Sequence, residues 1–181
     1  MSINFNNSSR INTAAYASLL NTIAKGESGG NYNAHFGNSA NRSIQFTEMT
    51  ISEVFEWQDS HIKDGNVSNA VGKYQIIKPT LTELVEKLGV EQNVKFDKTL
   101  QDQMAIALIE RRGSIEYIES KLTREEFAAN LAKEWAALPR ITGTNPDESY
   151  YSYDGINKSN ISVDEVYGAL HAFKSEATAS L

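Results

Sequence analysis

Residues 100–109 read Leu-Gln-Asp-Gln-Met-Ala-Ile-Ala-Leu-Ile, and this run sets the expected architecture of the chain. At 3.6 residues per turn, Met104, Ile106 and Leu108 point to different sides of a helix, so apolar side chains surround it nearly completely. A helix that is apolar all round is buried on every side. We therefore predict a predominantly α-helical protein built around a buried central helix.

Other helices are predicted from their start and stop residues. Three segments have the Ser/Thr-x-x-Glu pattern of a capping box, at residues 50–53, 123–126 and 162–165. Leu19 and Ile23 recur at helical spacing, and we expect Gly26 to end their helix. Pro79 suits the first turn of a further helix, which we expect Gly89 to end.

Two stretches do not have a helical pattern. Residues 27–47 are rich in Gly, Asn and Ser with short apolar islands, and we expect a small β-hairpin there. Residues 139–160 form a long, polar and aromatic connection, and connections of that length in a compact domain are usually functional or disordered. No linker separates two domains, so we predict a polar N-terminal arm at residues 1–12 and a single domain at residues 13–181.

Composition excludes several classes of protein. A net charge of −6 argues against nucleic-acid binding, and the absence of cysteine removes disulfide and thiolate chemistry. The N-terminus has no apolar run behind a positive region, which excludes an ordinary secretory signal peptide. No stretch approaches the roughly 18 apolar residues of a membrane span, so we expect no membrane insertion.

Glu27 is the candidate catalytic residue. It follows the first predicted helix and precedes a flexible Ser-Gly-Gly-Asn turn at residues 28–31. The partial negative charge of a helix C-terminus disfavours an ionised carboxylate, and apolar neighbours would raise its pKa further. A carboxylic acid that stays protonated near neutrality can donate its proton to a glycosidic oxygen. The alternative is that Glu27 is an ordinary solvated residue at a helix end.

The segment 71–80, Val-Gly-Lys-Tyr-Gln-Ile-Ile-Lys-Pro-Thr, resembles the Gly-x-x-Gln-Ile-x-Pro-x-Thr stretch of goose-type lysozymes and lytic transglycosylases. In those enzymes the glycine-led turn lines the cleft opposite the catalytic acid, and the glutamine faces the sugar. The resemblance therefore implies that Gln75 binds substrate. The plainer alternative makes Gly72 a turn residue and Gln75 an ordinary polar residue before a helix.

The order of motifs along the chain resembles the lambda-phage endolysin family. The Glu27 turn is followed by Gly-Lys-Tyr-Gln-Ile at 72–76, by Glu-Arg-Arg-Gly at 110–113, and by Trp-Ala-Ala-Leu-Pro at 135–139. The resemblance implies an α+β, lysozyme-like fold and cleavage of the MurNAc–GlcNAc β-1,4 bond as a lytic transglycosylase. It implies peptidoglycan glycan strands as the partner and a monomer without metal or cofactor. We expect synthesis in the bacterial host cytoplasm and action on the periplasmic wall after release.

Residues 28–47 contain no Asp or Glu, which supports the same chemistry independently. Phage T4-type lysozymes place a second acid about nine positions after the catalytic glutamate, where this chain has Phe36. A two-carboxylate glycosidase needs that second group, whereas attack by the substrate's own 6-hydroxyl group does not. A hydrolytic lysozyme stays open as an alternative if one acid further along the chain folds back to the cleft: Glu48, Glu53, Glu56 or Asp59.

Several other residues have both a functional and a structural interpretation. Tyr74, Tyr150 and Tyr151 suit packing against sugar faces, and equally suit half-buried core positions. Ser28 could hydrogen-bond the acid, or could simply cap the backbone of its turn. We expect both tryptophans, Trp57 and Trp135, to be core anchors.

Three other functions have some basis in the sequence. Residues 26–30 match Gly-x-Ser-x-Gly, and Ser28, Asp154 and His171 follow in the order of an α/β-hydrolase triad, but no strand precedes the serine. The histidines (His35, His61 and His171) are scattered without a zinc-ligand spacing. A non-catalytic lysozyme-like module, either a phage structural part or a glycan-binding one, would keep the same fold without turnover.

Overall fold

A computed structural model describes residues 11–179 of the chain, which divide into two compact units. Within the described residues, the first unit comprises 28–104, and the second comprises 11–27 together with 105–179. Both boundaries fall inside helices: one between Glu27 and Ser28 in α1 (Ala17–Ser28), the other between Met104 and Ala105 in α4 (Lys98–Arg111). That the chain acts as one catalytic domain over 13–181 stays a prediction.

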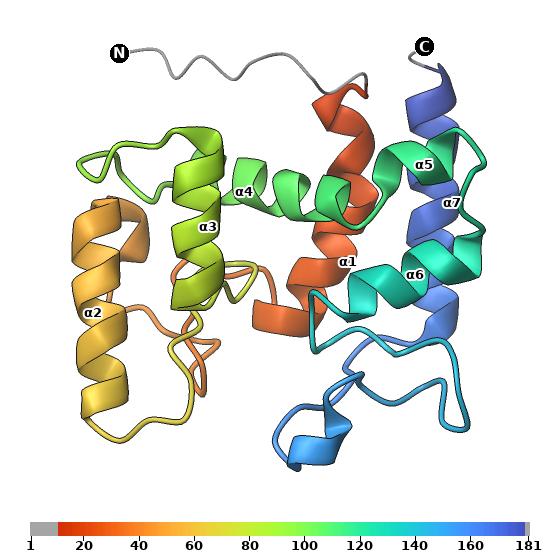
Figure 1. Cartoon of the computed structure of the whole chain (residues 1–181). Coiled ribbons are helices and arrows are strands. Elements are labelled where there is room, and N and C mark those ends of the chain that lie inside the picture. Colours follow the sequence, from red (N-terminus) through yellow and green to blue (C-terminus); the bar gives the residue numbers. More distant parts are fainter. Residues whose placement is uncertain (1–10, 180–181) are drawn as a thin grey trace. The chain divides into compact units, whose positions relative to one another are not determined.

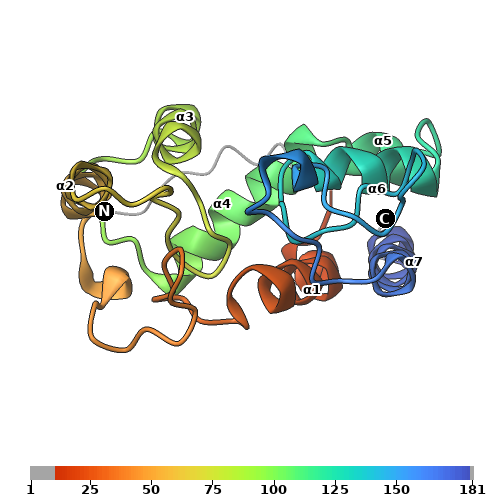
Figure 2. The same cartoon turned by 90° about the horizontal axis from the view of Figure 1, so that it is seen from below.

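The first unit contains α2 (Ile51–Lys63), α3 (Lys78–Leu88), the first half of α4 and a short 3-10 helix, η2 (Phe46–Glu48). Helices α2 and α3 run alongside each other in both views (Figures 1 and 2). The capping box at Thr50 and Glu53 starts α2 as predicted. Helix α3 has Pro79 in its first turn and ends at Gly89, whose φ of 63° lies in the left-handed region that glycine tolerates.

The second unit is helical around α7 (Val163–Ala179), which packs against η1 (Thr13–Tyr16), α5 (Ser114–Ile118) and α6 (Arg124–Ala132). Aromatic rings fill the space between these helices. Phe173 lies 4.9 Å from Tyr16 and 6.4 Å from Phe127, measured between ring centroids. The predicted capping boxes are present at the start of α6 and α7, the latter with Ser162 accepting from the Glu165 amide.

Helix α4 confirms the prediction of a central buried helix. Residues 100–110 contain no exposed position, and Met104, Leu108 and Ile109 are at most 2% accessible to solvent. The burial of these side chains shows that the apolar run contributes to the hydrophobic core. The described residues are mainly helical, as predicted.

The prediction that Gly26 ends the first helix is wrong, because α1 continues through Ser28. A Cβ atom on Gly26 would lie 2.8 Å from Ile161 Cγ1 and 2.9 Å from Ala137 Cβ. Glycine is therefore needed here for close packing inside the second unit and not for a turn. The positive φ values that end the helix belong to Gly29 and Gly30.

Within the described residues, the segment 27–47 forms no strand, so the predicted β-hairpin is not seen. Only isolated β-bridges occur, such as His35 with Asn38 and with Val71. Asparagine side chains bond the backbone instead: Asn41 donates to the carbonyls of Asn33 and Ile44. Side-chain amides that bind backbone groups locally compete with the ladder of a sheet, which explains the irregular path.

The long connection 139–160 is also held by local contacts. A bridge joins Pro139 to Ser149, and η3 (Ser152–Asp154) follows it. The carboxylate of Asp154 accepts from the amides of Ile156 and Asn157, which closes the next turn. The segment is therefore ordered without being helical along most of its length.

Most of the predicted N-terminal arm, residues 1–10, lies outside the described residues. Ile11 is buried, and the side chain of Asn12 caps η1 by accepting from the Ala14 amide. None of the helices in residues 11–179 is long and apolar enough to cross a lipid bilayer.

Candidate active site

Glu27 lies in the last turn of α1, inside the second unit. Its Oε1 atom accepts a 3.0 Å hydrogen bond from the backbone amide of Ala137, which follows α6. The carbonyl of Ala137 in turn accepts from the amide of Asn160 at 2.9 Å. The side chain of Asn160 donates to the carbonyl of Gly26 at 3.1 Å, so three segments of the unit hold the carboxyl group in place.

Burial raises the pKa of Glu27 from 4.5 to about 7, and the hydrogen bond from Ala137 only partly offsets this effect. The residue as a whole keeps some solvent access, while protein atoms surround its carboxyl group densely enough to disfavour the charged form. The helix C-terminus acts in the same direction. At neutral pH the group therefore exists in both protonation states, which suits a residue that first gives and then takes a proton.

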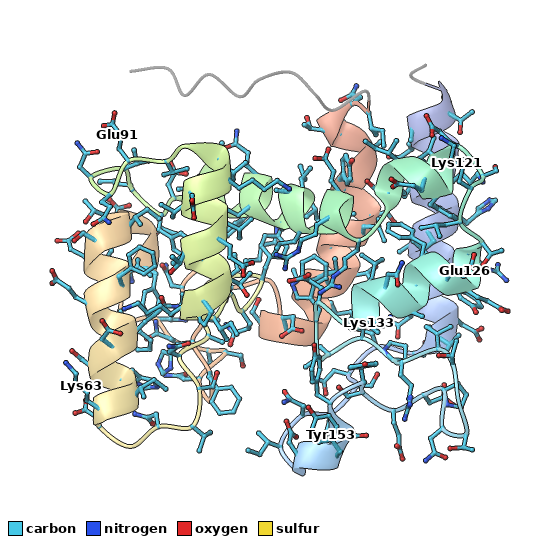
Figure 3. The ribbon with its side chains drawn as sticks, viewed as in Figure 1. Lys63, Glu91, Lys121, Glu126, Lys133 and Tyr153 are labelled. Atoms are coloured by element: carbon cyan, nitrogen blue, oxygen red, sulfur yellow. The ribbon has the colours of Figure 1, made fainter. Side chains whose placement is uncertain are left out.

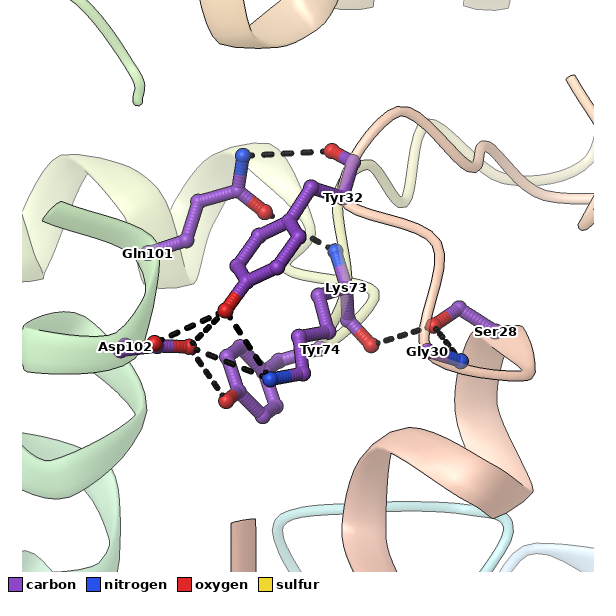
Figure 4. Close-up of polar contacts among 7 residues, drawn as sticks. All are labelled: Ser28, Gly30, Tyr32, Lys73, Tyr74, Gln101 and Asp102. Carbon is purple, nitrogen blue, oxygen red and sulfur yellow. Dashed lines mark hydrogen bonds and ion pairs between the residues drawn. The ribbon is translucent and has the colours of Figure 1, made fainter. Parts of the chain in front are cut away.

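Ser28 begins the first unit and is 3% exposed. Its hydroxyl group donates to the carbonyl of Lys73 at 2.7 Å and accepts from the amide of Gly30 at 3.2 Å. These bonds tie the turn after α1 to the turn that begins at Gly72 (Figure 4). Such contacts favour the structural role that the sequence left open for Ser28.

Gln75 occupies the tip of the turn between Val71 and Ile76, two residues joined by an isolated bridge. Its φ of 48° is unusual for a residue other than glycine, and its side-chain amide donates to the carbonyl of Gly72 at 2.9 Å. Strained backbone of this kind often occurs where a side chain has a functional task. Glu27 belongs to the second unit and Gln75 to the first, and their meeting across a cleft stays a prediction.

A polar cluster beneath this turn was not anticipated from the sequence. The carboxylate of Asp102 on α4 accepts hydrogen bonds from the hydroxyl groups of Tyr74 at 2.6 Å and Tyr32 at 2.8 Å (Figure 4). The ammonium group of Lys73 donates to the Tyr32 hydroxyl at 3.0 Å and lies 3.5 Å from Asp102. Nearby, the side chain of Gln101 accepts from the Lys73 amide.

This cluster explains the position of Tyr74. The side chain is 1% exposed, and burial together with the hydrogen bond to Asp102 raises its pKa. The phenol therefore stays neutral and acts as a donor that fixes the turn. Its position favours the core role over sugar packing, two alternatives that the sequence left open.

Tyr150 and Tyr151 lie in the second unit, in the connection that follows Pro139. Their ring centroids are 5.1 Å apart in an edge-on arrangement, and Tyr150 is 41% exposed. The hydroxyl group of Tyr151 donates to the carbonyl of Lys133 at 2.7 Å, and burial raises its pKa. The ring of Tyr153, which is 82% exposed and labelled in Figure 3, lies 6.4 Å from that of Tyr151, measured between centroids. Sugar binding there stays a prediction.

Most of the acids that could supply a second carboxylate are engaged in ion pairs or in a helix cap. Glu48 pairs with Lys95 and Asp59 with Lys78, while Glu53 completes the capping box of α2. Glu56 is exposed on α2 and has no ion pair in the described part of the chain.

Two histidines that are far apart in the chain lie close together, which no sequence pattern indicated. His35 and His61 have ring centroids 5.5 Å apart, and Trp57 stacks on His61 at 4.3 Å.

Trp57 is only half-buried, so the prediction that it is a core anchor is wrong, whereas Trp135 is 3% exposed as predicted. Among residues 11–179, no three acidic or histidine side chains form a group that could hold a metal ion.

Comparison with protein-family models matches residues 17–159 to the family described as Endolysin. The matched region extends from α1 to the connection after η3 and so includes parts of both units. Searches of curated proteins and of solved structures each found no match.

Proposed function

Because the chain belongs to the endolysin family of phage enzymes that degrade peptidoglycan, we propose that it cleaves the MurNAc–GlcNAc β-1,4 bond through Glu27. The single observation that supports this choice is the environment of the Glu27 carboxyl group, whose burial raises its pKa to about 7. We propose with it a lysozyme-like fold, a monomer, and action on the periplasmic wall after release from the host cytoplasm.

The proposed reaction is that of a lytic transglycosylase. Protonated Glu27 gives its proton to the glycosidic oxygen while the bond from that oxygen to C1 of the muramoyl residue breaks. The resulting carboxylate then accepts the proton of the muramoyl 6-hydroxyl group as that oxygen bonds to C1. The product ends in 1,6-anhydro-MurNAc, no water is consumed, and Glu27 is protonated again.

Two features favour this one-carboxylate mechanism over hydrolysis. Residues 28–47 contain no acid, and Glu48, Glu53 and Asp59 are engaged by their neighbours. Intramolecular attack by the 6-hydroxyl group has a high effective molarity, so no second carboxylate is needed to position water. A hydrolase with a second carboxylate and a non-catalytic glycan-binding module stay as the competing functions.

The test combines a lysis assay with product analysis. Glu27→Gln should reduce clearing of outer-membrane-permeabilised cells by at least ~100-fold, because the amide cannot give up a proton. Glu86→Gln, which alters an exposed acid on α3, is the matched control and should clear cells like the wild type. Equal clearing by Glu27→Gln would remove Glu27 from the role of acid.

Mass spectrometry of the released muropeptides then separates the two chemistries. An anhydro end lacks one water relative to a reducing end. Each cut by a transglycosylase therefore gives a product that is about 18 mass units lighter than the hydrolysis product. Reducing ends alone would overturn the proposed mechanism. Loss of clearing in a variant at Glu48, Glu53, Glu56 or Asp59 would identify the second carboxylate of a hydrolase.

A further inference from the structure

The first unit contains a polar pocket that has no role in the proposed reaction. It has a volume of about 640 Å³, and most of its lining comes from the irregular segment after α1. The residues important for its chemistry are Asn31, Asn33, Asn41, Arg42 and Gln45. None of the lining residues is acidic, and only Arg42 is charged. A volume of this size accommodates a small polar ligand.

The asparagines of this pocket are structural. Asn41 is 3% exposed, and its side chain bonds the carbonyls of Asn33 and Ile44 and the amide of Ser43. The side chain of Asn31 donates to the carbonyls of Ser39 and Asn41. These side-chain amides are already hydrogen-bonded to the backbone. They therefore stabilise the pocket wall and are not the groups that would bind a ligand.

Arg42 differs from these residues. It is exposed at the pocket, and its guanidinium group has no hydrogen bond, ion pair or ring contact within residues 11–179. Its backbone carbonyl accepts from the side chain of Gln45 at 2.6 Å, so the main chain beneath the side chain is fixed. A guanidinium group on a fixed backbone, without a protein partner, is suited to bind a planar anion such as a carboxylate in a bidentate manner.

We propose that this pocket binds a carboxylate of the substituent on the muramoyl residue, with Arg42 as its direct partner. Peptidoglycan offers this group from two sources, the stem peptide and the free lactyl group of a muramoyl residue that has lost its stem. The pocket lining includes Ser28, the residue next to Glu27 in the chain, which is the reason for choosing a substituent of the muramoyl residue as its ligand. This inference rests on the proposed function for its choice of substrate.

Direct binding tests the proposal without relying on cleavage. The probe is N-acetylmuramoyl-L-alanyl-D-glutamate, titrated into the full-length protein and followed by NMR at low ionic strength. Arg42→Ala should raise its dissociation constant at least ~10-fold, and Arg42→Lys should recover only part of the affinity because it loses the planar fork. The same compound with both free carboxyl groups amidated should bind the wild type as weakly as the acid binds Arg42→Ala.

Two further probes separate the sources of the carboxylate. N-acetylmuramic acid presents only the lactyl carboxylate, and N-acetylglucosamine presents none. If Arg42→Ala weakens binding of the muramoyl dipeptide alone, the stem supplies the carboxylate. If it weakens N-acetylmuramic acid equally, the pocket also accepts the free lactyl carboxylate of a muramoyl residue without a stem. Both results support the pocket and differ only in the source.

Lys63→Ala is the matched control, because it removes one positive charge from an exposed position at the end of α2 in the same unit (Figure 3). Equal weakening by Lys63→Ala would show a general charge effect and overturn the proposal. So would equal affinity of the wild type and Arg42→Ala. Because the Arg42 side chain is exposed and makes no hydrogen bond or ion pair within residues 11–179, its variants should keep the thermal midpoint of the wild type.

Failure of this inference is distinguishable from failure of the proposed function. Normal wall cleavage that requires Glu27 but shows no dependence of dipeptide binding on Arg42 would reject the pocket alone. Dipeptide binding that depends on Arg42 in a protein without glycosidic cleavage would retain the pocket and reject the mechanism.

Discussion

The amide nitrogen of Ala137 lies 3.0 Å from Oε1 of Glu27, although the two residues are 110 positions apart in the chain. One hydrogen bond to a carboxylate favours the charged form, and burial favours the neutral form. Burial is the larger effect, so the pKa settles at about 7 instead of 4.5. The bond positions the acid without forcing it to ionise.

We expect activity to fall above about pH 7, because Glu27 must start the reaction protonated. In that range each further pH unit should reduce the turnover number about tenfold, as the protonated fraction falls. The measurement is a pH–rate profile on purified wall fragments at constant ionic strength. Activity that stays level up to pH 9 would contradict a requirement for protonated Glu27.

Glu27 should also make the fold more stable at low pH than at neutral pH. Between about pH 4.5 and 7 the folded protein retains the Glu27 proton while the unfolded chain loses it, so the free energy of unfolding falls as pH rises. The full change is up to ~3 kcal/mol, at 1.36 kcal/mol per unit of pKa. Glu27→Gln lacks this contribution, so urea titrations should show its stability relative to the wild type increasing from pH 4.5 to 7. A constant difference would mean that the carboxyl group is solvated.

Gly26→Ala should both destabilise the protein and lower its activity. The new methyl group would overlap Ile161 and Ala137, and Ala137 is the hydrogen-bond partner of Glu27. Overpacking of this kind costs about 1–3 kcal/mol. The matched control is Gly168→Ala in α7, where a Cβ meets nothing within 4 Å, and helix propensity should stabilise that variant by up to ~1 kcal/mol. Equal effects at both positions would show that packing around Gly26 is loose.

Asp102→Asn should lower the free energy of unfolding by about 1.5–3 kcal/mol, because the buried phenol of Tyr74 loses a charged acceptor. Asp59→Asn is the control, since its pair with Lys78 is exposed and contributes at most ~1 kcal/mol. Denaturant unfolding of both variants at pH 7 makes the comparison. A smaller loss for Asp102 than for Asp59 would reject the cluster as the support of the Gly72–Gln75 turn.

Ser28→Ala should cost about 1 kcal/mol of stability through loss of the hydrogen bond to Lys73, and should keep most of the lytic activity. A serine hydrolase would instead lose all turnover with this change. Clearing of permeabilised cells, together with a chromogenic ester assay, measures both possibilities. Abolished activity in a variant that still folds would revive Ser28 as a nucleophile.

Local sequence patterns were enough to predict the helix starts. The capping boxes at Thr50, Thr123 and Ser162 involve residues three positions apart, so nothing distant in the chain changes them. The apolar run in α4 was equally informative, because a helix without a polar face has only one stable location.

The errors arise where a residue's role depends on distant partners. Gly26 was taken for a helix stop because its neighbour Ile161, 135 positions later, cannot be seen in the sequence. The expected hairpin is not seen, because the side chain of Asn41 bonds backbone carbonyls that a sheet would otherwise pair. The position of Tyr74 depends on Asp102, which belongs to another helix. Glu27 was predicted as the acid from its place after the first helix, a role that stays a prediction, whereas no sequence pattern indicated its hydrogen-bond partner Ala137.

The division of the chain inside α1 and α4 has a practical consequence for protein engineering. A truncation at either boundary would sever a helix, and one inside α4 would also divide the apolar run at residues 100–109 and expose its side chains to water. Chimaeras that exchange modules with related proteins should therefore be joined in surface loops, such as the one after Gly89, instead of at the boundaries between the units.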